Sequence, residues 1–398
     1  MKQLPYYQKN IIVLGICIFL CAVSYQIIMP FFPRLLADLG VEEQNISYWT
    51  GLIFSCQSAA FMIAAPLWGK VGDTYGRKKM ILRAGTVISI SYFAMFFCRD
   101  PYQLLVVRIV NGFFTGFIPA SITLVSTNTP EDRVLPYVAA MQTVSASGTI
   151  AGPAVGGFLG ALWGFQSSVL VGASAVFVST IMVLAFVKEI NMPRPDPGHR
   201  TTLWQDIAIS FRNPVIKNLV VMNFFQGICV QGVMPFIIIH MDGQVSDFVS
   251  GILYSLPAVA MIFTAQRWSR LGKTMSQYLM IIIGFIGSGA AIVLLANVRS
   301  LVLFGIFMFL FGLMNSGITT NLTAKTVSSI EEDFRGRALS IQSTFQTLGA
   351  VTTPVTAGII IQARGTAFSF SAVGILTLVV GILFWVVLKN DLANSPAK

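Results

Sequence analysis

Long runs of apolar residues, each about 20 residues in length, recur along the whole chain and are separated by short polar segments. A helix of about 20 residues crosses roughly 30 Å of hydrocarbon. Only helices and closed barrels pair every backbone N–H and C=O group there. The runs are too long and too continuous for the alternating pattern of barrel strands. The pattern therefore predicts an all-α integral membrane protein with twelve transmembrane helices.

The predicted spans lie near residues 11–33, 48–69, 80–98, 101–125, 135–160, 168–187, 216–240, 247–266, 276–296, 300–323, 339–362 and 367–388. The first run starts close to the N-terminus and could be mistaken for a secretory signal. No small-x-small cleavage site follows it at the required distance. We therefore interpret this run as the first span.

Composition and charge agree with a membrane protein. The 398 residues are 55% hydrophobic and 11% charged, whereas soluble domains usually carry about 25% charged residues. The net charge of +10 is unevenly distributed, since one set of loops carries only Arg34, Arg99, Arg299 and Arg364. Basic loops stay in the cytoplasm, so both termini are predicted to be cytoplasmic. The charge therefore indicates orientation and not a nucleic-acid partner.

The chain repeats itself at a shift of about 200 residues. The matching segments are Gln26–Phe32 with Gln231–Ile237, Thr50–Ser55 with Ser250–Ser255, and Gly148–Gly157 with Gly349–Gly358. This duplication predicts two pseudo-symmetric six-helix bundles, 1–187 and 215–398, joined by a cytoplasmic linker, 188–214. Parallel repeats of this kind hold a substrate site at their interface near the middle of the membrane.

The segment Gly69–Met80, GKVGDTYGRKKM, concentrates charge between the second and third spans. Its glycines are expected to let the backbone turn sharply, and its basic residues to hold the loop in the cytoplasm. The Asp73 carboxylate is expected to accept hydrogen bonds from a neighbouring helix N-terminus, where the helix dipole favours negative charge. The loop would then act as a latch between the two halves.

Three segments carry a resemblance to a known family. The pattern G-x-x-x-D-x-x-G-R-K, met at Gly69, Asp73, Gly76, Arg77 and Lys78, resembles the loop signature of the major facilitator superfamily. Arg108 to Gly112 resembles the fourth-span signature of its proton-driven members. The fifth span resembles the signature of drug and metabolite antiporters at Gly148, Gly152, Pro153, Gly156 and Gly157. The chain looks most similar to twelve-span drug:proton antiporters of the MdtG-like multidrug group.

The resemblance implies the major facilitator fold and a role for Asp73 in locking the outward-facing state against the eleventh helix. Many members of the family carry an acid near the end of the fourth span, where this chain has Ser126. Arg77 is therefore expected to pair with Glu131 or Asp132 instead.

Arg108 is the ionised group that lies deepest inside a predicted span. Such residues are costly in hydrocarbon and usually face a bundle interior or a cavity. A guanidinium keeps its proton, with a pKa above about 12, so Arg108 is expected to bind an acceptor or to influence a nearby proton site. The alternative is a structural arginine that bonds to carbonyl groups between helices.

No Asp or Glu falls in the interior of a predicted span, although proton antiporters commonly use a buried carboxylate. The nearest titratable groups are Asp38, His240, Asp242, Asp73, Glu131 and Asp132. Coupling through Asp73 is our preferred interpretation. A uniporter or an exporter with another driving force is the alternative.

The small residues of the fifth span form one face of a helix. They predict a close contact that seals the cavity and a bend at Pro153, or else ordinary tight packing between membrane helices.

Polar and aromatic side chains recur in the spans that would form a cavity. The candidates are Gln26, Phe31, Gln57, Asn111, Gln142, Asn223, Gln226, Gln231, Tyr254, Asn315, Gln342, Phe345 and Gln346. The amides either bond between helices or line a wet pocket with apolar walls, which suits a loosely held lipophilic substrate. We expect neutral, zwitterionic or weakly anionic compounds to bind better than permanent cations.

These observations predict a bacterial exporter of the cytoplasmic membrane that exchanges small lipophilic compounds or drugs for protons and confers antibiotic resistance. The alternative is a dedicated exporter or importer of one metabolite, such as a siderophore or a sugar. The duplicated halves disfavour a channel or receptor. There is no Walker loop for ATP and no cluster typical of an enzyme or a metal centre. We expect no cofactor beyond the proton gradient, a lipid bilayer as surroundings, and a monomer.

Overall fold

The computed structural model describes residues 5–190, 211–241, 245–330 and 332–388, without the side chains of 273 and 332–336. The candidate Asp242 and most of the predicted linker lie outside these residues. The first half of the described chain contains α1 (Tyr6–Ile28), α2 (Phe32–Asp38), α3 (Glu43–Tyr75), α4 (Arg77–Phe97), α5 (Pro101–Phe114), α6 (Phe117–Thr127), α7 (Glu131–Trp163) and α8 (Phe165–Phe186). The second half contains α10 (Pro214–Gln231), the 3-10 helix η1 (Met234–Phe236), α11 (Ile237–His240), α12 (Asp247–Thr274), α13 (Gln277–Asn297), α14 (Leu301–Ser329), α15 (Glu332–Arg364) and α16 (Thr366–Val387).

Each of the twelve predicted spans coincides with one helix or with two or three consecutive helices, which confirms the predicted fold class. Eleven of the described spans are long and apolar enough to cross a membrane. The remaining one is α7, whose 33 residues include many Gly, Ala, Ser and Thr. These small residues lower its hydropathy but allow close packing against other helices.

Several helix starts follow directly from local sequence. Asp100 precedes α5 and accepts a hydrogen bond from the Gln103 N–H at 2.9 Å, and Pro101 fills the first helical position. Asn213 precedes α10 in the same way, with Pro214 at the first position. Asp and Asn are strong N-caps, and proline lacks the N–H that would be unsatisfied at this position.

The fourth span is broken between α5 and α6. Gly116 has a φ of +129°, a conformation that favours glycine. Arg83 from α4 donates through Nη2 to the carbonyl oxygens of Phe114 (3.2 Å) and Thr115 (3.3 Å). A break at membrane depth is tolerated when side chains satisfy the freed backbone groups in this way.

The first and seventh predicted spans are also interrupted. The first span was expected to continue as one helix to about residue 33, but α1 ends at Ile28 and α2 begins at Phe32. The intervening Pro30 explains the difference, since proline cannot donate a backbone hydrogen bond inside a helix.

The chain divides into two compact units. Unit 1 comprises Met1–Trp49, Cys56–Gly198 and Met241–Ser255, and unit 2 comprises Thr50–Ser55, His199–His240 and Leu256–Lys398. Each unit thus includes a short segment from the other half of the sequence. The boundaries predicted from the repeat, 1–187 and 215–398, stay a prediction.

The two units share the same helix pairings. In unit 1, α1 packs on α7 and α8, and α4 packs on α8, α5 and α6. In unit 2, α10 packs on α15 and α16, and α13 packs on α16 and α14. The pairs correspond span by span, as the sequence repeat predicts.

The repeat extends to single contacts. The Trp68 indole donates to the Phe113 carbonyl at 2.8 Å, and Trp268 donates to the Leu313 carbonyl at 2.8 Å. A Cβ built on Gly51 would lie 2.1 Å from the Pro354 oxygen. The matching Cβ on Gly251 would lie 2.2 Å from the Pro153 oxygen. The duplication therefore preserves packing as well as sequence.

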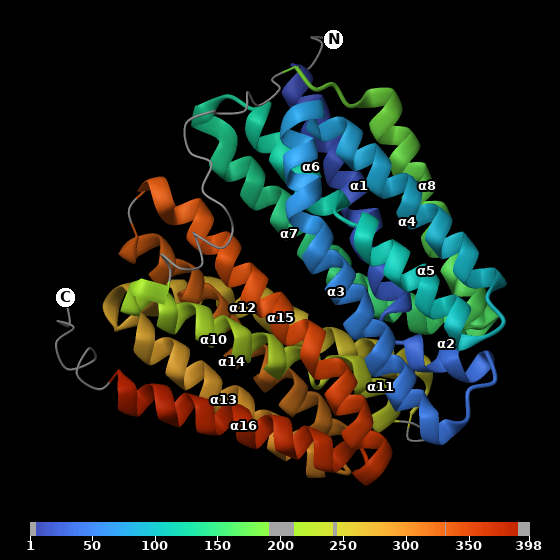
Figure 1. Ribbon diagram of the computed structural model, residues 1–398, viewed down its shortest axis with the longest axis vertical. Coiled ribbons are helices and arrows are strands. Elements are labelled where there is room, and N and C mark those ends of the chain that lie inside the picture. Colours follow the sequence, from blue (N-terminus) through green and yellow to red (C-terminus); the bar gives the residue numbers. More distant parts are fainter. Residues whose placement is uncertain (1–4, 191–210, 242–244, 331, 389–398) are drawn as a thin grey trace. The chain divides into compact units, whose positions relative to one another are not determined.

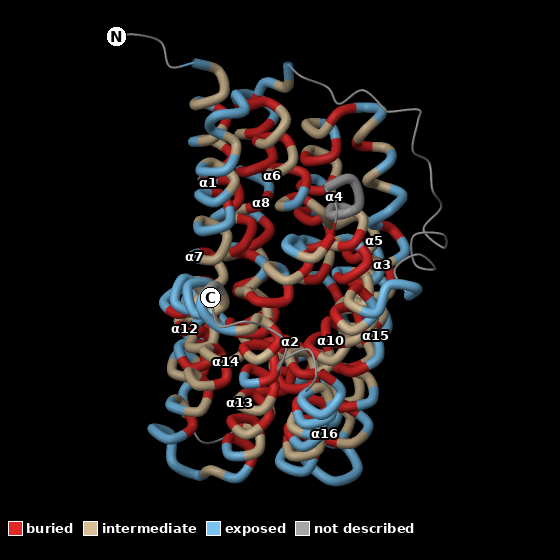
Figure 2. Tube along the Cα trace, turned by 90° about the vertical axis from the view of Figure 1, so that its left-hand side faces the viewer, coloured by how far each residue is buried: buried red, intermediate tan, exposed pale blue. Residues whose placement is uncertain are grey.

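Buried and exposed residues alternate along the helices (Figure 2). Large apolar side chains such as Ile63, Val302 and Leu383 are exposed, as expected for surfaces that meet lipid tails. By contrast, the largest fully buried side chain in the described chain is that of Arg108.

Candidate functional site

The chain turns between α3 and α4 at Gly76, whose φ is +96°. The sequence suggested that Gly69 and Gly72 also form this turn, and this was wrong, because both lie inside α3. Gly72 instead makes room for a side chain, since a Cβ there would lie 2.8 Å from Nη1 of Arg77. A Cβ on Gly69 would meet nothing within 4 Å. Gly76 is therefore the one loop-motif glycine with a backbone reason to be glycine.

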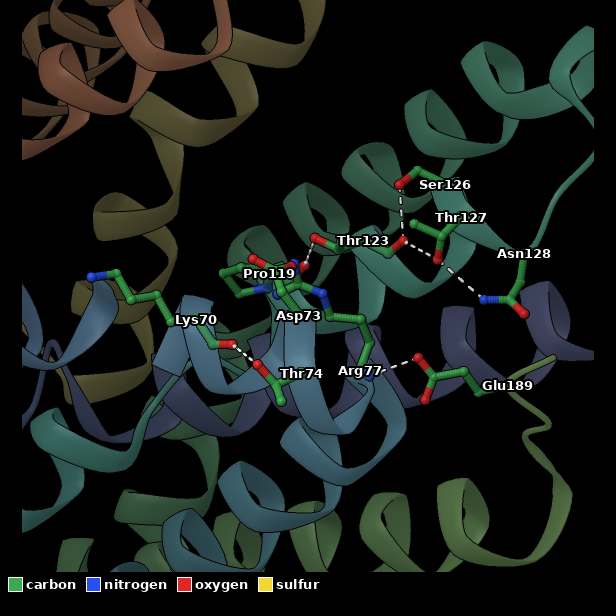
Figure 3. Close-up of polar contacts among 10 residues, drawn as sticks. All are labelled: Lys70, Asp73, Thr74, Arg77, Pro119, Thr123, Ser126, Thr127, Asn128 and Glu189. Carbon is green, nitrogen blue, oxygen red and sulfur yellow. Dashed lines mark hydrogen bonds and ion pairs between the residues drawn. The ribbon is translucent and has the colours of Figure 1, made fainter. Parts of the chain in front are cut away.

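Asp73 and Arg77 form an ion pair across this turn (Figure 3). The Arg77 side chain is 17% exposed and that of Asp73 is 47% exposed. The expected pairing of Arg77 with Glu131 or Asp132 was wrong. Those two acids occupy the first turn of α7, where the positive end of the helix favours carboxylates.

The position that lacks the family's acid is used locally. The Ser126 hydroxyl donates to the Thr123 carbonyl of its own helix at 2.8 Å. Asp132 pairs with the adjacent Arg133 at 3.4 Å. Arg77 therefore pairs with an acid of its own turn, Asp73, and not with an acid near the end of the fourth span.

Glu189 is a functional candidate that the sequence did not reveal. Its carboxylate accepts hydrogen bonds from the backbone N–H groups of Arg77 (2.7 Å) and Lys78 (2.9 Å). These are the first two residues of α4, whose N–H groups have no partner within the helix. The sequence assigned this contact to Asp73, and this was wrong, because the Asp73 carboxylate bonds to the Arg77 side chain and the carboxylate at the start of α4 is Glu189.

Residues 188–190, at the start of the predicted linker, are bound to three helices. The Asn10 side chain of α1 donates to the Lys188 carbonyl (2.6 Å) and accepts from the Lys188 N–H (3.0 Å). Glu189 caps α4 (Figure 3). The Ile190 N–H donates to the Asn128 side-chain oxygen at 2.8 Å. In addition, Lys78 Nζ donates to the Leu184 carbonyl at 3.0 Å, where the end of α8 favours a cation. The loop motif and the start of the linker therefore form one connected structure in unit 1.

Replacing Glu189 with alanine is expected to lower the free energy of unfolding by about 1–2 kcal/mol, the usual contribution of a helix cap. Transport should slow as well, because the start of α4 loses its attachment to the linker. Glu189→Gln keeps an acceptor oxygen. Its free energy of unfolding and its transport rate should therefore lie between those of the native protein and those of Glu189→Ala. Thermal unfolding in detergent and transport rates in vesicles measure these effects. Glu43→Ala is the matched control, since Glu43 is an exposed acid in the first turn of α3; equal losses in the two alanine variants would refute the capping role.

Arg108 lies at the centre of a second polar group in unit 1. Its guanidinium donates through Nη2 to the Gln57 side-chain oxygen and, at 3.4 Å, to the Met29 sulfur. Gln57 in turn donates to Asn111 at 3.4 Å. The structural alternative, an arginine bonded to carbonyl groups between helices, describes Arg83 and not Arg108.

Gly112 brings this group together. A Cβ at Gly112 would lie 2.3 Å from the Gln57 carbonyl oxygen, so α5 approaches α3 more closely than any other residue would allow. The same holds in unit 2, where a Cβ at Gly312 would lie 2.3 Å from the Pro257 oxygen.

The fifth-span glycines make the predicted close contact with α1. A Cβ would lie 2.7 Å from Ala22 Cβ at Gly148, 2.4 Å from Gln26 Cβ at Gly152, and 2.5 Å from a backbone oxygen at Gly156. Gly157 faces the first residue of α12, with 2.4 Å to its carbonyl oxygen. Pro153 lies inside α7, which continues through it.

The predicted cavity residues separate into different environments. In unit 2, Gln226 donates to Asn315 (3.4 Å) and Thr319 (2.5 Å), and Gln346 donates to Gln226 at 3.5 Å. This group on α10, α14 and α15 is hereafter the Gln226 cluster. Gln342 donates to Thr326 nearby.

Other candidates have packing roles in the structure. Phe31 is 1% exposed and stacks on Phe165 with ring centroids 4.7 Å apart. Asn223 donates to a carbonyl of its own helix, at 2.9 Å. Phe345 packs beside a buried apolar cluster of unit 2. Of the rest, Tyr254 is buried, Gln26 and Gln231 are half-buried, and Gln142 is exposed.

The duplicated helical units with polar groups buried in their spans define a class of protein, the polytopic membrane transporters. A sequence model of the Major Facilitator Superfamily matches residues 14–271 and 219–398. The chain therefore belongs to the Major Facilitator Superfamily.

Named relatives are similar over most of the chain. The multi-drug resistance efflux pump PmrA of Streptococcus pneumoniae is 27% identical over 342 residues, which cover 85% of both chains. The multidrug resistance protein MdtG of Klebsiella pneumoniae is 27% identical over 398 residues, covering 98% of this chain and 95% of MdtG. A mutant of the nucleoside transporter NupG has a similar fold, with a TM-score of 0.83 at 13% identity over 95% of this chain and 99% of its own.

These comparisons confirm the resemblance stated from the motifs. The protein is a multi-pass transporter of the cell membrane that acts on small molecules, and its relatives are transporters and not enzymes.

Proposed function

We propose that this protein exports small lipophilic compounds, drugs among them, in exchange for protons and by alternating access. The observation that carries the proposal is the similarity to relatives named as multidrug efflux pumps across 85% to 98% of the chain. A bacterial cytoplasmic membrane and a monomer are part of the same proposal.

The buried polar groups support a loosely held substrate. The Gln226 cluster offers amide and hydroxyl groups on three different helices of unit 2. The polar group at Arg108 offers a cation and two amides in unit 1. A small number of polar groups among apolar side chains orients a lipophilic ligand without demanding one exact shape.

Two carboxyl groups are candidates for proton coupling. Asp73 is paired with Arg77, so protonation of Asp73 would release the arginine and loosen the turn. Asp38, at the end of α2, is the second candidate. Burial raises the pKa of the Asp38 carboxyl, Arg34 opposes the rise, and Asp247 adds to it. We propose Asp73 as the coupling residue and Asp38 as the runner-up.

Dye extrusion from membrane vesicles tests the function. Vesicles that contain the protein should extrude a lipophilic dye against its gradient when a pH gradient is imposed, and an uncoupler should stop the extrusion. A panel of unrelated compounds separates a multidrug exporter from a transporter of one metabolite. Extrusion that persists unchanged with the uncoupler would exclude proton exchange.

Asp73→Asn is expected to slow extrusion about fivefold, which corresponds to the roughly 1 kcal/mol of a partly exposed ion pair. The neutral amide cannot hold Arg77 by charge, and the amount of protein in the membrane should stay near normal. Initial extrusion rates per amount of protein measure the effect. Glu43→Gln removes a negative charge elsewhere on α3 and should leave the rate unchanged, whereas unchanged transport by Asp73→Asn would remove the proposed role of the turn.

A further inference from the structure

The surroundings of Arg108 contain more hydrogen-bond donors than acceptors. Nη2 has the Gln57 oxygen and the Met29 sulfur as acceptors, but Nε and Nη1 have none among the residues that the structure describes. The amide nitrogen of Asn111 also lacks an acceptor there, while its oxygen already accepts from Gln57. Arg108 and Asn111 are three residues apart on α5 and therefore share one face of the helix.

The charge of Arg108 is also uncompensated. The side chain is 0% exposed, and no described carboxylate forms an ion pair with it. Its other neighbours are the Phe32 ring at 5.3 Å and the neutral Tyr25 and Tyr92 side chains, of which Tyr92 brings its hydroxyl within hydrogen-bonding reach of the guanidinium but supplies no negative charge. A buried cation without a counter-charge is strongly unfavourable, so the arrangement calls for a negatively charged occupant.

Arg83 shows what a structural arginine looks like in the same unit. Its Nε and Nη1 also lack acceptors in the described chain. However, its Nη2 is bonded to two backbone carbonyl groups, and its guanidinium lies 3.7 Å from the centre of the Trp68 ring. Arg83 is moreover only partly buried. Arg108, by contrast, donates to side chains and not to the carbonyl groups freed by a helix break, and it is completely buried.

We propose that Arg108 and Asn111 bind one oxyanion, a carboxylate or a group of similar shape, carried by the transported compound. The oxygens would accept from the N–H groups that now lack acceptors, and the negative charge would neutralise the guanidinium. The planar guanidinium fork matches a carboxylate in geometry. This inference rests on the proposed function only in taking the occupant to be a substrate.

The neighbouring side chains define the rest of the ligand. Met29 offers a weak sulfur acceptor on a flexible side chain, which an anionic oxygen can displace. Phe32 supplies an apolar wall. The site therefore selects a lipophilic body with one negative charge, and the charge of Arg108 disfavours permanent cations.

Binding of two matched probes to the purified full-length protein tests the inference. We would use 1-pyrenebutyrate, an anion at pH 7, and the uncharged 1-pyrenebutanol, with energy transfer from tryptophan to pyrene as the readout. The native protein should bind the carboxylate about 10- to 100-fold more tightly than the alcohol, as charged hydrogen bonds imply. Arg108→Gln should bring this ratio to about 1 and leave the Kd of the alcohol within about twofold. Equal binding of the two probes by the native protein, or a preserved preference in Arg108→Gln, overturns the proposal.

Two further variants keep the test decisive. Arg83→Gln is the matched control and should retain the preference for the carboxylate probe. A loss of preference equal to that of Arg108→Gln would show that the effect is not local and would overturn the site.

Asn111→Leu should reduce the preference about fivefold, as expected for the loss of one hydrogen bond to a charged group. If Arg108→Gln does not fold, as judged by thermal unfolding, Asn111→Leu decides instead, and a full preference in that variant overturns the proposal.

The binding test is independent of the proposed proton exchange, because it uses no gradient. If the extrusion rate does not depend on the pH gradient but the protein binds the carboxylate probe preferentially, only the proposed proton exchange is refuted. Proton-driven extrusion without any carboxylate preference would refute only the oxyanion site.

Discussion

Arg108→Ala is expected to abolish gradient-driven extrusion, and Arg108→Lys is expected to recover less than about a tenth of it. The alanine removes the only charge in a fully buried polar group, and Gln57 loses the donor that its oxygen now accepts from. Lysine restores the charge but has no planar fork, so it cannot present two parallel N–H groups to one oxyanion. Extrusion rates in vesicles, normalised to the amount of folded protein, measure both effects.

Arg83→Lys is the matched control for this experiment. Its ammonium group can still reach the carbonyl oxygens of Phe114 and Thr115, which are the present acceptors of Arg83. Most of the extrusion rate should therefore remain. A fully active Arg108→Lys protein would contradict the requirement for a guanidinium.

Gly152→Leu is expected to stop turnover and to destabilise unit 1. Even the first added carbon would lie 2.4 Å from Gln26 Cβ and 2.9 Å from the Val23 carbonyl oxygen. Since one of these contacts is backbone, relief requires α1 and α7 to separate. Overpacking of this kind typically costs about 1–3 kcal/mol, so Gly152→Ala should already lower the temperature of thermal unfolding.

Gly172 provides a matched control on α8. It is also buried and also faces α1, but a Cβ there would have its nearest neighbour at 3.5 Å, an ordinary contact distance. Gly172→Ala should therefore unfold at nearly the native temperature and transport normally. If the alanine variants of Gly152 and Gly172 behave alike, close approach of α1 and α7 is not the reason for glycine in the fifth span.

The fold could be predicted from the sequence because hydrophobic length is a local property. Twenty apolar residues have few structures open to them in a bilayer, so each span could be recognised alone. The repeat was detectable because equivalent positions in the two halves kept similar residues. Trp68 and Trp268, for example, occupy equivalent positions in both sequence and structure. The helix break at Gly116 was missed, because its apolar flanks read as one continuous span.

The candidate site was less predictable because its contacts join distant parts of the chain. Glu189 lies 112 residues from Arg77, and nothing in its own surroundings in the sequence marks it as a helix cap. Gly69 and Gly72 were assigned to a turn on their residue type, but only φ distinguishes a turn glycine from a helix glycine. Phe31 was expected to line a cavity, yet the spacing of a residue along a helix does not show that a ring such as that of Phe165 covers it.

The fourth span differs mechanically from its counterpart in the second half. It consists of two short helices, α5 and α6, separated by a break at Gly116, whereas α14 is one continuous helix from Leu301 to Ser329. Arg108 lies about two helical turns before this break in the sequence. A force on Arg108 would rotate α5 about Gly116 without moving α6. The same force on α14 would tilt the whole helix. The break therefore gives the fourth span a bend point that α14 lacks.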